Sequence, residues 1–245
     1  MKKAYFSIFT AVIISILLSF PCDSHAQLKD ILNKAKQTVL PSDDGEIGLG
    51  LKQALEFGVN EAVEKLSSEK GYLESPYKIL IPEEARQIIA KVKMVPGFQD
   101  VEKQLIDKMN KAAELAAKKA TPIFVEAITD MTFKDAMNIL LGEHDAATQY
   151  LETNTRIQLY NLFLPVIQSA LDEVNARTYW TSVMNAYNSI PFVKKVNPAL
   201  DDHVNNKALD GLFSLIEVKE AKIRGDQSER KTDLLKKVFA KQDKG

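Results

Sequence analysis

Apolar residues recur at helical spacing through most of the chain, and the clearest run lies between residues 121 and 167. Thr121 and Pro122 predict a helix start there, because a capping hydroxyl and a first-turn proline are both typical of that position. The apolar positions that follow are three or four residues apart, namely Ile123, Phe124, Ala127, Ile128 and Met131. This spacing predicts a short amphipathic helix.

Two more helices are predicted directly after it. Thr132 with Asp135 has the spacing of a capping box, and Gly142 is expected to end that helix with a positive φ. A longer helix is expected to start near Asp145, and Pro165 falls within its apolar run. Because proline removes a helical hydrogen bond, we expect a kink or a break there. The connectors are short, so these helices must fold back on one another.

The same periodicity predicts helices on both sides of this central region. They are expected over residues 28–40, 46–66, 82–94, 98–119, 177–188, 201–224 and 231–239. The alanine-rich second half of 98–119 would let a neighbouring helix approach closely, and Gly211 is expected to mark a close helix crossing. Only 77–81 is expected to include a strand. The pattern predicts an all-α multi-helix bundle of about eight to ten helices, one domain over 27–245.

Residues 1–26 have the features of an export signal. Lys2 and Lys3 are followed by an apolar stretch over 4–20 and by small residues at the position that a signal peptidase recognises. Cleavage after Ala26 would make Gln27 the first residue of the mature protein. The sequence therefore predicts a periplasmic protein.

Two alternatives to cleavage remain open. The apolar stretch 4–20 is close to the lower length limit for spanning a bilayer, so it would also suit an uncleaved anchor. Cys22 would be the lipidated residue of a lipoprotein, but Pro21 before it fits that signal poorly. Cys22 is also the only cysteine. We therefore expect a mature protein with no disulfide and no thiol chemistry.

The charge balance gives no reason to expect an anionic partner. The chain has 32 basic and 33 acidic residues, a net charge of −1, so neither nucleic acid nor an anionic membrane surface is indicated. The 45% apolar fraction is ordinary for a globular protein and argues against wholesale disorder. We expect no stable membrane insertion once the signal is removed.

The sequence contains no recognisable catalytic motif. It has no G-x-S-x-G and no H-E-x-x-H, and the glycines at 45, 48 and 50 lack the other residues of a phosphate-binding loop. Glu126 and Asp130 are spaced like paired carboxylates, but a solvated helix face explains them better. Asp210 lies within an apolar stripe and is expected to be a hydrogen-bonded structural acid. No cofactor is expected, and we do not predict an enzyme.

A polar group in the central stretch offers the candidate ligand-binding residues. Gln149, Tyr150 and Arg156 are side-chain types that recognise polar ligands, although a hydrogen-bond network between helices explains them more simply. Trp180 belongs to an aromatic group expected to pack around Pro165. The alternative is that this group lines an apolar pocket between helices.

Both histidines outside the signal lie beside acidic residues at predicted helix starts. His144 precedes Asp145, and His203 follows Asp202. Helix capping is the simpler interpretation, because carboxylates are favoured at helix N-termini. If the two helix starts met, the four side chains would supply nitrogen and oxygen ligands for a metal ion.

Four motifs in order, PIFVEAITDMT, GEHDAATQYLETNT, NKALDGLF and LLKKVF, resemble the exported bacterial family catalogued as domain of unknown function 4197. The resemblance covers roughly residues 28–239. It implies an exported helical protein of Gram-negative bacteria, and it implies no activity, cofactor or catalytic residue.

The functional prediction rests on a globular pattern without catalytic motifs. We predict a non-enzymatic module that binds a partner protein or another component of the bacterial envelope. A carrier of an apolar or amphipathic small molecule is the second possibility. A hydrolase or metal-binding protein with an acid–histidine site is the third. The sequence does not indicate an oligomeric state.

Overall fold

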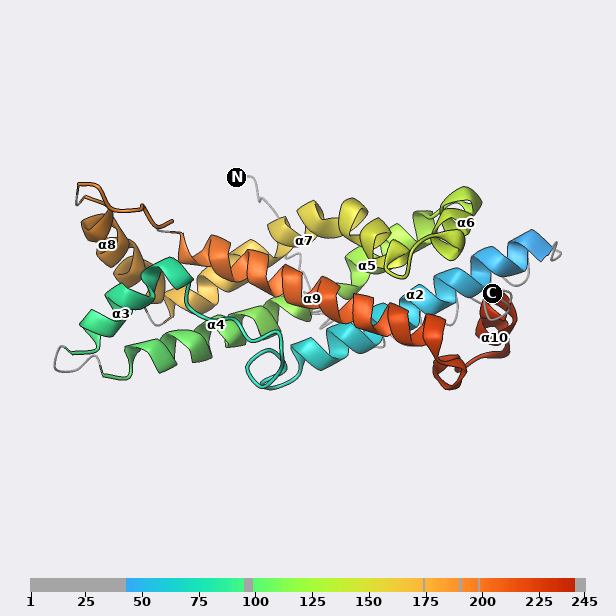
Figure 1. The fold of residues 1–245 in the computed structure, drawn as a ribbon, viewed down its shortest axis with the longest axis horizontal. Helices are drawn as coiled ribbons and strands as arrows, with labels where there is room; N and C mark the ends of the chain where they lie inside the picture. Colours follow the sequence, from blue (N-terminus) through green and yellow to red (C-terminus); the bar gives the residue numbers. More distant parts are fainter. Residues whose placement is uncertain (1–42, 95–98, 174, 190, 198, 241–245) are drawn as a thin grey trace, which may run out of the picture. The chain divides into compact units, whose positions relative to one another are not determined.

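A computed structural model describes residues 43–94, 99–173, 175–189, 191–197 and 199–240. These residues form nine α-helices and two short 3-10 turns, and no strand is found among them (Figure 1). The helices are α2 (Asp43–Ser67), α3 (Arg86–Val92), α4 (Val101–Ala117), α5 (Thr121–Asp130), α6 (Phe133–Leu141), α7 (Ala146–Asp172), α8 (Ala176–Asn188), α9 (Leu200–Gly225) and α10 (Asp233–Phe239). The 3-10 turns are η1 (Glu83–Ala85) and η2 (Gln227–Glu229). The all-α prediction is confirmed.

The described helices belong to one compact unit, Pro41–Gly245. The predicted signal over 1–26 and the predicted helix over 28–40 lie outside the described residues. Among the helices that are described, none has both the length and the apolar composition that crossing a bilayer requires.

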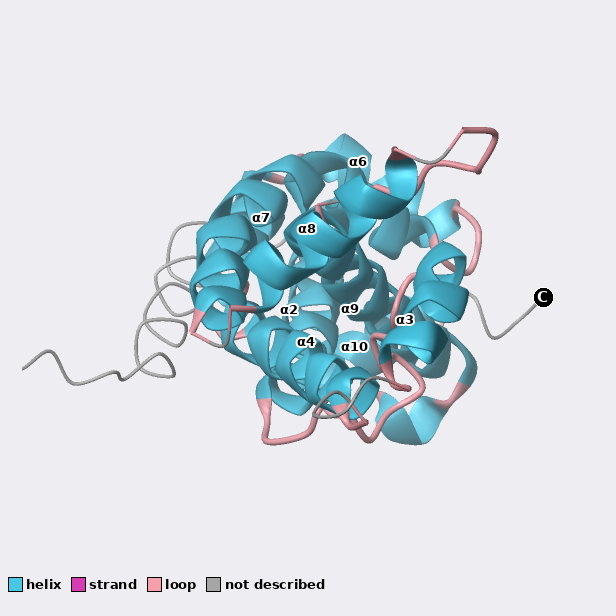
Figure 2. Ribbon diagram, turned by 90° about the vertical axis from the view of Figure 1, so that its left-hand side faces the viewer, coloured by secondary structure: helices cyan, strands magenta, loops and turns pink. Residues whose placement is uncertain are grey.

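Helices α7 and α9 form the central antiparallel pair. The backbone N–H of Ala147, at the start of α7, donates to Glu220 near the end of α9, while Gln168 near the end of α7 donates to Asp201 at the start of α9. Helix α4 also packs against both members of this pair, and α2 packs against α4, α5, α6, α9 and α10 (Figures 1 and 2). The core therefore lies between α2, α4, α7 and α9.

The alanine face of α4 lies in that core, as its sequence predicts. Four alanines on this face are completely buried, namely Ala112, Ala113, Ala116 and Ala117. Because a methyl group is the largest side chain at these positions, the α4 backbone can lie close to its neighbours. The core also contains large side chains. The rings of Phe124 on α5 and Phe213 on α9 meet edge to face with centroids 5.8 Å apart.

Helix α7 continues without a break through Pro165. The predicted break is therefore wrong. Pro165 and Asn161 are both exposed, whereas Phe163 and Ile167 are buried. The proline thus lies on the solvent side of the helix, where water can satisfy the carbonyl group of Asn161 that loses its helical donor.

At the helix termini, one predicted cap is confirmed and two predictions are wrong. Thr132 and Asp135 form the capping box, since the N–H of Thr132 donates to Asp135 Oδ2 at 2.9 Å and the N–H of Asp135 donates to Thr132 Oγ1 at 3.2 Å. Thr121 is not an N-cap, because it is already the first residue of α5. Gly142 has a φ of −81°, not a positive one. Its lack of a side chain matters for space, since a Cβ would lie 2.8 Å from that of Ala146.

The segment 77–81 forms no strand. Both backbone hydrogen-bonding groups of Ile79 are nevertheless paired, as they would be in a sheet, but with a side chain. The side chain of Asn110 on α4 accepts from the N–H of Ile79 at 2.8 Å and donates to its carbonyl at 2.9 Å. This segment also explains Gly211, whose absent Cβ would lie 3.0 Å from the Cβ of Tyr77. The close approach predicted at Gly211 is therefore made with this irregular segment and not with another helix.

Candidate functional site

The candidate ligand-binding residues near the start of α7 bond mainly to other parts of the protein. Arg156 donates to Glu152 at 2.5 Å and to Asp210 on α9 at 2.6 Å. Gln149 Nε2 donates to Asp145 at 2.8 Å, and the hydroxyl of Tyr150 lies 3.5 Å from the carbonyl oxygen of Ala127. Arg156 and Asp210 thus join the two central helices. Asp210 has the hydrogen-bonded structural role expected for it.

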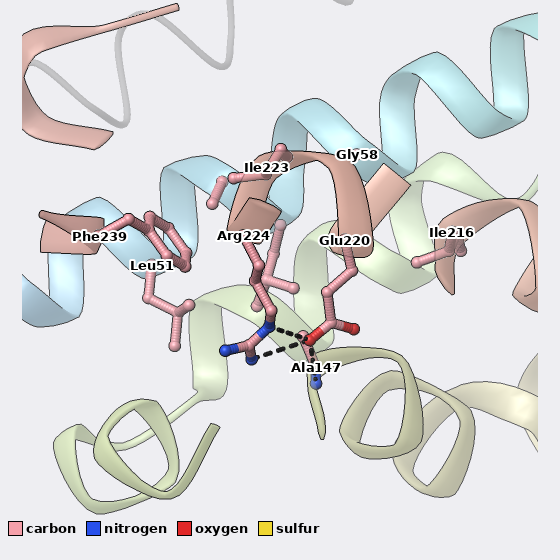
Figure 3. A pocket seen from close by; sticks show the side chains of 10 residues that line it. Leu51, Gly58, Ala147, Ile216, Glu220, Ile223, Arg224 and Phe239 are labelled. Carbon is pink, nitrogen blue, oxygen red and sulfur yellow. Dashed lines mark hydrogen bonds and ion pairs between the residues drawn. The ribbon is translucent and has the colours of Figure 1, made fainter. Parts of the chain in front are cut away.

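Trp180 lies in the core and is only 1% exposed. An apolar cavity does occur elsewhere, between α2, α9 and α10, beside Leu51, Gly58 and Phe239 (Figure 3). Its volume is about 20 Å³. That is space for a water molecule, whereas small-molecule sites have volumes of about 300 Å³ or more. This cavity therefore does not support the carrier alternative.

The four candidate metal ligands do not come together. His144 and Asp145 precede α7, while Asp202 and His203 lie in the first turn of α9. Since α7 and α9 are antiparallel, these two helix starts lie at opposite ends of the pair. Along α9, His203 is about 21 Å from Glu217, which lies beside His144.

His203 is instead held by the backbone. Its Nε2 lies 2.9 Å from the carbonyl oxygen of Leu80, an acceptor to which the ring nitrogen donates. Burial lowers the pKa of His203 below its ordinary value, and this outweighs the opposite effect of the bond to Leu80. Beside it, Asp202 accepts from the hydroxyl of Tyr160 at 2.7 Å and from the amide of Asn206 at 2.9 Å. This end of α9 is a structural contact.

The start of α7 is capped by an acid from another helix. Glu220 on α9 accepts from the backbone N–H group of Ala147 at 3.0 Å (Figure 3). It also accepts from the backbone N–H of Thr148 at 2.8 Å and from the Thr148 hydroxyl at 2.8 Å. Arg224 pairs with the same carboxylate at 2.9 Å and donates to the carbonyl of Ile139 at 2.8 Å. This buried pair therefore joins α6, α7 and α9.

The same contact brings Glu217 to the segment before α7. One ligand atom each from His144, Asp145 and Glu217 lies within 4.8 Å of the other two. Sequence reasoning selected the first two residues and missed Glu217 and Glu220. A signal for Glu220 was present, because it follows Leu212 and Ile216 at four-residue intervals along the buried stripe of α9.

A second distinctive feature is the loop between α8 and α9. The side chain of Asn188 accepts from the N–H of Val196 at 2.8 Å and donates to its carbonyl at 2.7 Å, which closes the loop. Phe192 on this loop is fully exposed, at 106% of its reference area, and has a φ of +67°. Lys194 and Lys195 follow it and are also exposed. The loop therefore presents an aromatic ring next to two cationic groups.

The described residues define an all-α protein with a core of buried apolar side chains. A family model described as protein of unknown function, DUF4197, matches residues 42–240. The chain belongs to this family, as the ordered motifs indicated. Comparisons with curated proteins and with solved structures gave no match.

Proposed function

We propose that the chain is exported to the periplasm and serves there as a non-enzymatic binding module. The partner is an envelope protein that receives Phe192 in an apolar pocket. The observation that carries this proposal is the fully exposed Phe192 ring on a loop closed by Asn188. The export signal at residues 1–26 supports the location.

The conformation of the loop favours presentation of the ring. A positive φ at a bulky side chain costs on the order of 1–3 kcal/mol and persists only where surrounding contacts hold it. The bidentate contact between Asn188 and Val196 is such a constraint. Burying a phenylalanine side chain in a partner would contribute about 1.5–3 kcal/mol. Because the loop is already closed, less conformational entropy is lost on binding.

The charges beside Phe192 indicate the chemistry of the partner. Lys194 and Lys195 are exposed, and the side chain of Lys194 keeps 83% exposure despite a 3.9 Å contact with Glu84. An apolar pocket with an acidic rim complements this arrangement. A membrane surface fits less well, because one ring and two lysines offer little of the apolar area that interfacial binding requires.

Site-specific crosslinking tests this proposal. A photoreactive residue at position 192, introduced in the native host, is expected to give one protein adduct of defined mass. The control position is 157, because Ile157 is an exposed apolar residue of α7, 78% exposed, far along the chain from the loop. Equal adducts at both positions, or adducts with lipid alone, would contradict a protein partner.

The identified partner is then purified and titrated with variants. We expect Phe192→Ala to weaken binding about 30-fold, which corresponds to a hot-spot contribution of about 2 kcal/mol. Ile157→Ala should stay within about twofold of the unchanged protein. Charge reversal at Lys194 and Lys195 should mainly slow association. An unchanged affinity for Phe192→Ala would overturn the proposal.

A further inference from the structure

The segment before α7 offers a divalent metal site that differs from the one predicted by sequence. We infer that His144, Asp145 and Glu217 bind a single divalent transition-metal ion, with Zn²⁺ as the natural probe. The three ligand atoms lie within 4.8 Å of one another. One imidazole nitrogen and two carboxylate oxygens form a ligand set that zinc accepts, with water completing the coordination.

Capping does not account for Asp145. It occupies the N-cap position of α7, but its side chain accepts no hydrogen bond from the helix backbone. The N–H groups at this start are satisfied by Glu220 from α9. The side-chain bond that Asp145 does make is with Gln149 Nε2, at 2.8 Å. Such a donor orients a ligating carboxylate and leaves its other lone pairs available.

The negative charges of Asp145 and Glu217 are the second observation that favours a cation here. Among the described residues, no lysine or arginine forms an ion pair with Asp145 or Glu217, whereas Glu220 one turn further on is paired with Arg224. Two carboxylates held close together repel each other, and a divalent cation between them removes that repulsion. The site is partly open, since His144 is exposed while Asp145 and Glu217 are half-buried.

The buried pair behind the site fixes its geometry. Glu220 joins α9 to the first residues of α7, so Glu217 and Asp145 come from segments held at a set separation. Zinc bonds of about 2.0–2.2 Å place tetrahedral ligand atoms about 3.3 Å apart. In the inferred complex, rotation of the exposed His144 ring and of the Glu217 side chain closes the trio from 4.8 Å around the ion.

Calorimetric titration of the purified, chelator-treated protein with Zn²⁺ tests the site. We expect one ion per chain, with affinity reduced about 100-fold by Glu217→Gln and by His144→Ala. Glu143→Gln is the matched control, because it removes the same charge from an exposed neighbour outside the trio and should change affinity less than about twofold.

Thermal unfolding supplies a second readout that does not depend on heat of binding. Zn²⁺ should raise the Tm of the unchanged protein and of Glu143→Gln, and leave that of Glu217→Gln where it is. No binding at millimolar Zn²⁺, more than one equivalent site, or equal losses in the glutamine variants at 143 and 217 would each overturn the inference. The proposed partner site uses none of these residues, so the two proposals fail independently.

Discussion

Helices α7 and α9 both begin beside a histidine and two acidic residues, but their starts are held in different ways. At the start of α9 the local acids have partners, as Asp201 accepts from Gln168 at 2.7 Å and Asp202 from Tyr160 at 2.7 Å. At the start of α7 the N–H groups donate to Glu220, which comes from α9.

The two starts differ in what engages their acids: α9 has no capping side chain and its acids bond to side chains of α7, whereas α7 is capped by an acid from α9. Where local acids are engaged by partner side chains, as in the first turn of α9, they have fewer lone pairs left for a ligand. At the start of α7, where Glu220 supplies the cap, His144 is exposed and Asp145 accepts one side-chain bond, from Gln149 on its own helix.

The largest effect is expected from removing the distant cap. Glu220→Ala leaves two backbone N–H groups of α7 without their acceptor and the largely buried Arg224 side chain without its carboxylate. Breaking a buried ion pair by removing one partner costs about 3–5 kcal/mol. We expect urea unfolding to show a loss of that size. Glu143→Ala, at an exposed acid, should stay within about 0.5 kcal/mol, and a loss below about 1 kcal/mol for Glu220→Ala would contradict the capping role.

A smaller effect is expected from the local acid at α9. Asp202→Asn weakens a charge-assisted bond to Tyr160 and should cost about 1–2 kcal/mol. The bond to Asp202, together with burial, raises the pKa of Tyr160 to about 12. In the variant that pKa should fall, which NMR titration of the ring resonances would show. Asp145→Asn, at the other helix start, should leave the Tyr160 titration unchanged.

The histidine of α9 should make stability depend on pH. Because burial lowers the pKa of folded His203 below its unfolded value, the unfolded chain binds the proton more readily. The stabilisation is therefore present above about pH 6.5 and is lost as pH falls through the unfolded pKa toward the folded one. His203→Gln, which can still donate to Leu80, should reduce the loss of unfolding free energy between pH 7.5 and pH 5. His144→Gln, at an exposed ring, is the control, and equal pH slopes in the two variants would contradict this role.

The sequence could predict contacts between residues that lie close together in the chain. The Thr132–Asp135 capping box needs two residues three positions apart, so both partners are visible in one short motif. The buried face of α4 follows from the spacing of its alanines. Even here, the prediction of a positive φ at Gly142 is wrong, because glycine also occurs where a side chain lacks space and not only where φ is positive.

Contacts between distant residues could not be predicted in the same way. The cap of α7 joins Ala147 to Glu220, 73 positions apart, and the partner of Ile79 is Asn110, 31 positions away. Both depend on the register between packed elements, which the periodicity of a single helix does not contain. The Asn188–Val196 contact spans only 8 positions, but it too depends on the conformation of an irregular loop. The Ala147–Glu220 contact lies behind the inferred metal site, and the Asn188–Val196 contact closes the loop of the proposed partner site.

The smallest effect on stability is expected at Glu217, one turn before Glu220. Without metal, Glu217→Ala should change the free energy of unfolding by less than about 0.5 kcal/mol, and toward stabilisation, because it relieves repulsion with Asp145. With Zn²⁺ present, the unchanged protein should gain stability by mass action and the variant should not. Urea unfolding with and without Zn²⁺ measures both effects. A loss above about 1 kcal/mol without metal would show that Glu217 supports the start of α7 as Glu220 does, and the contrast between the two glutamates would disappear.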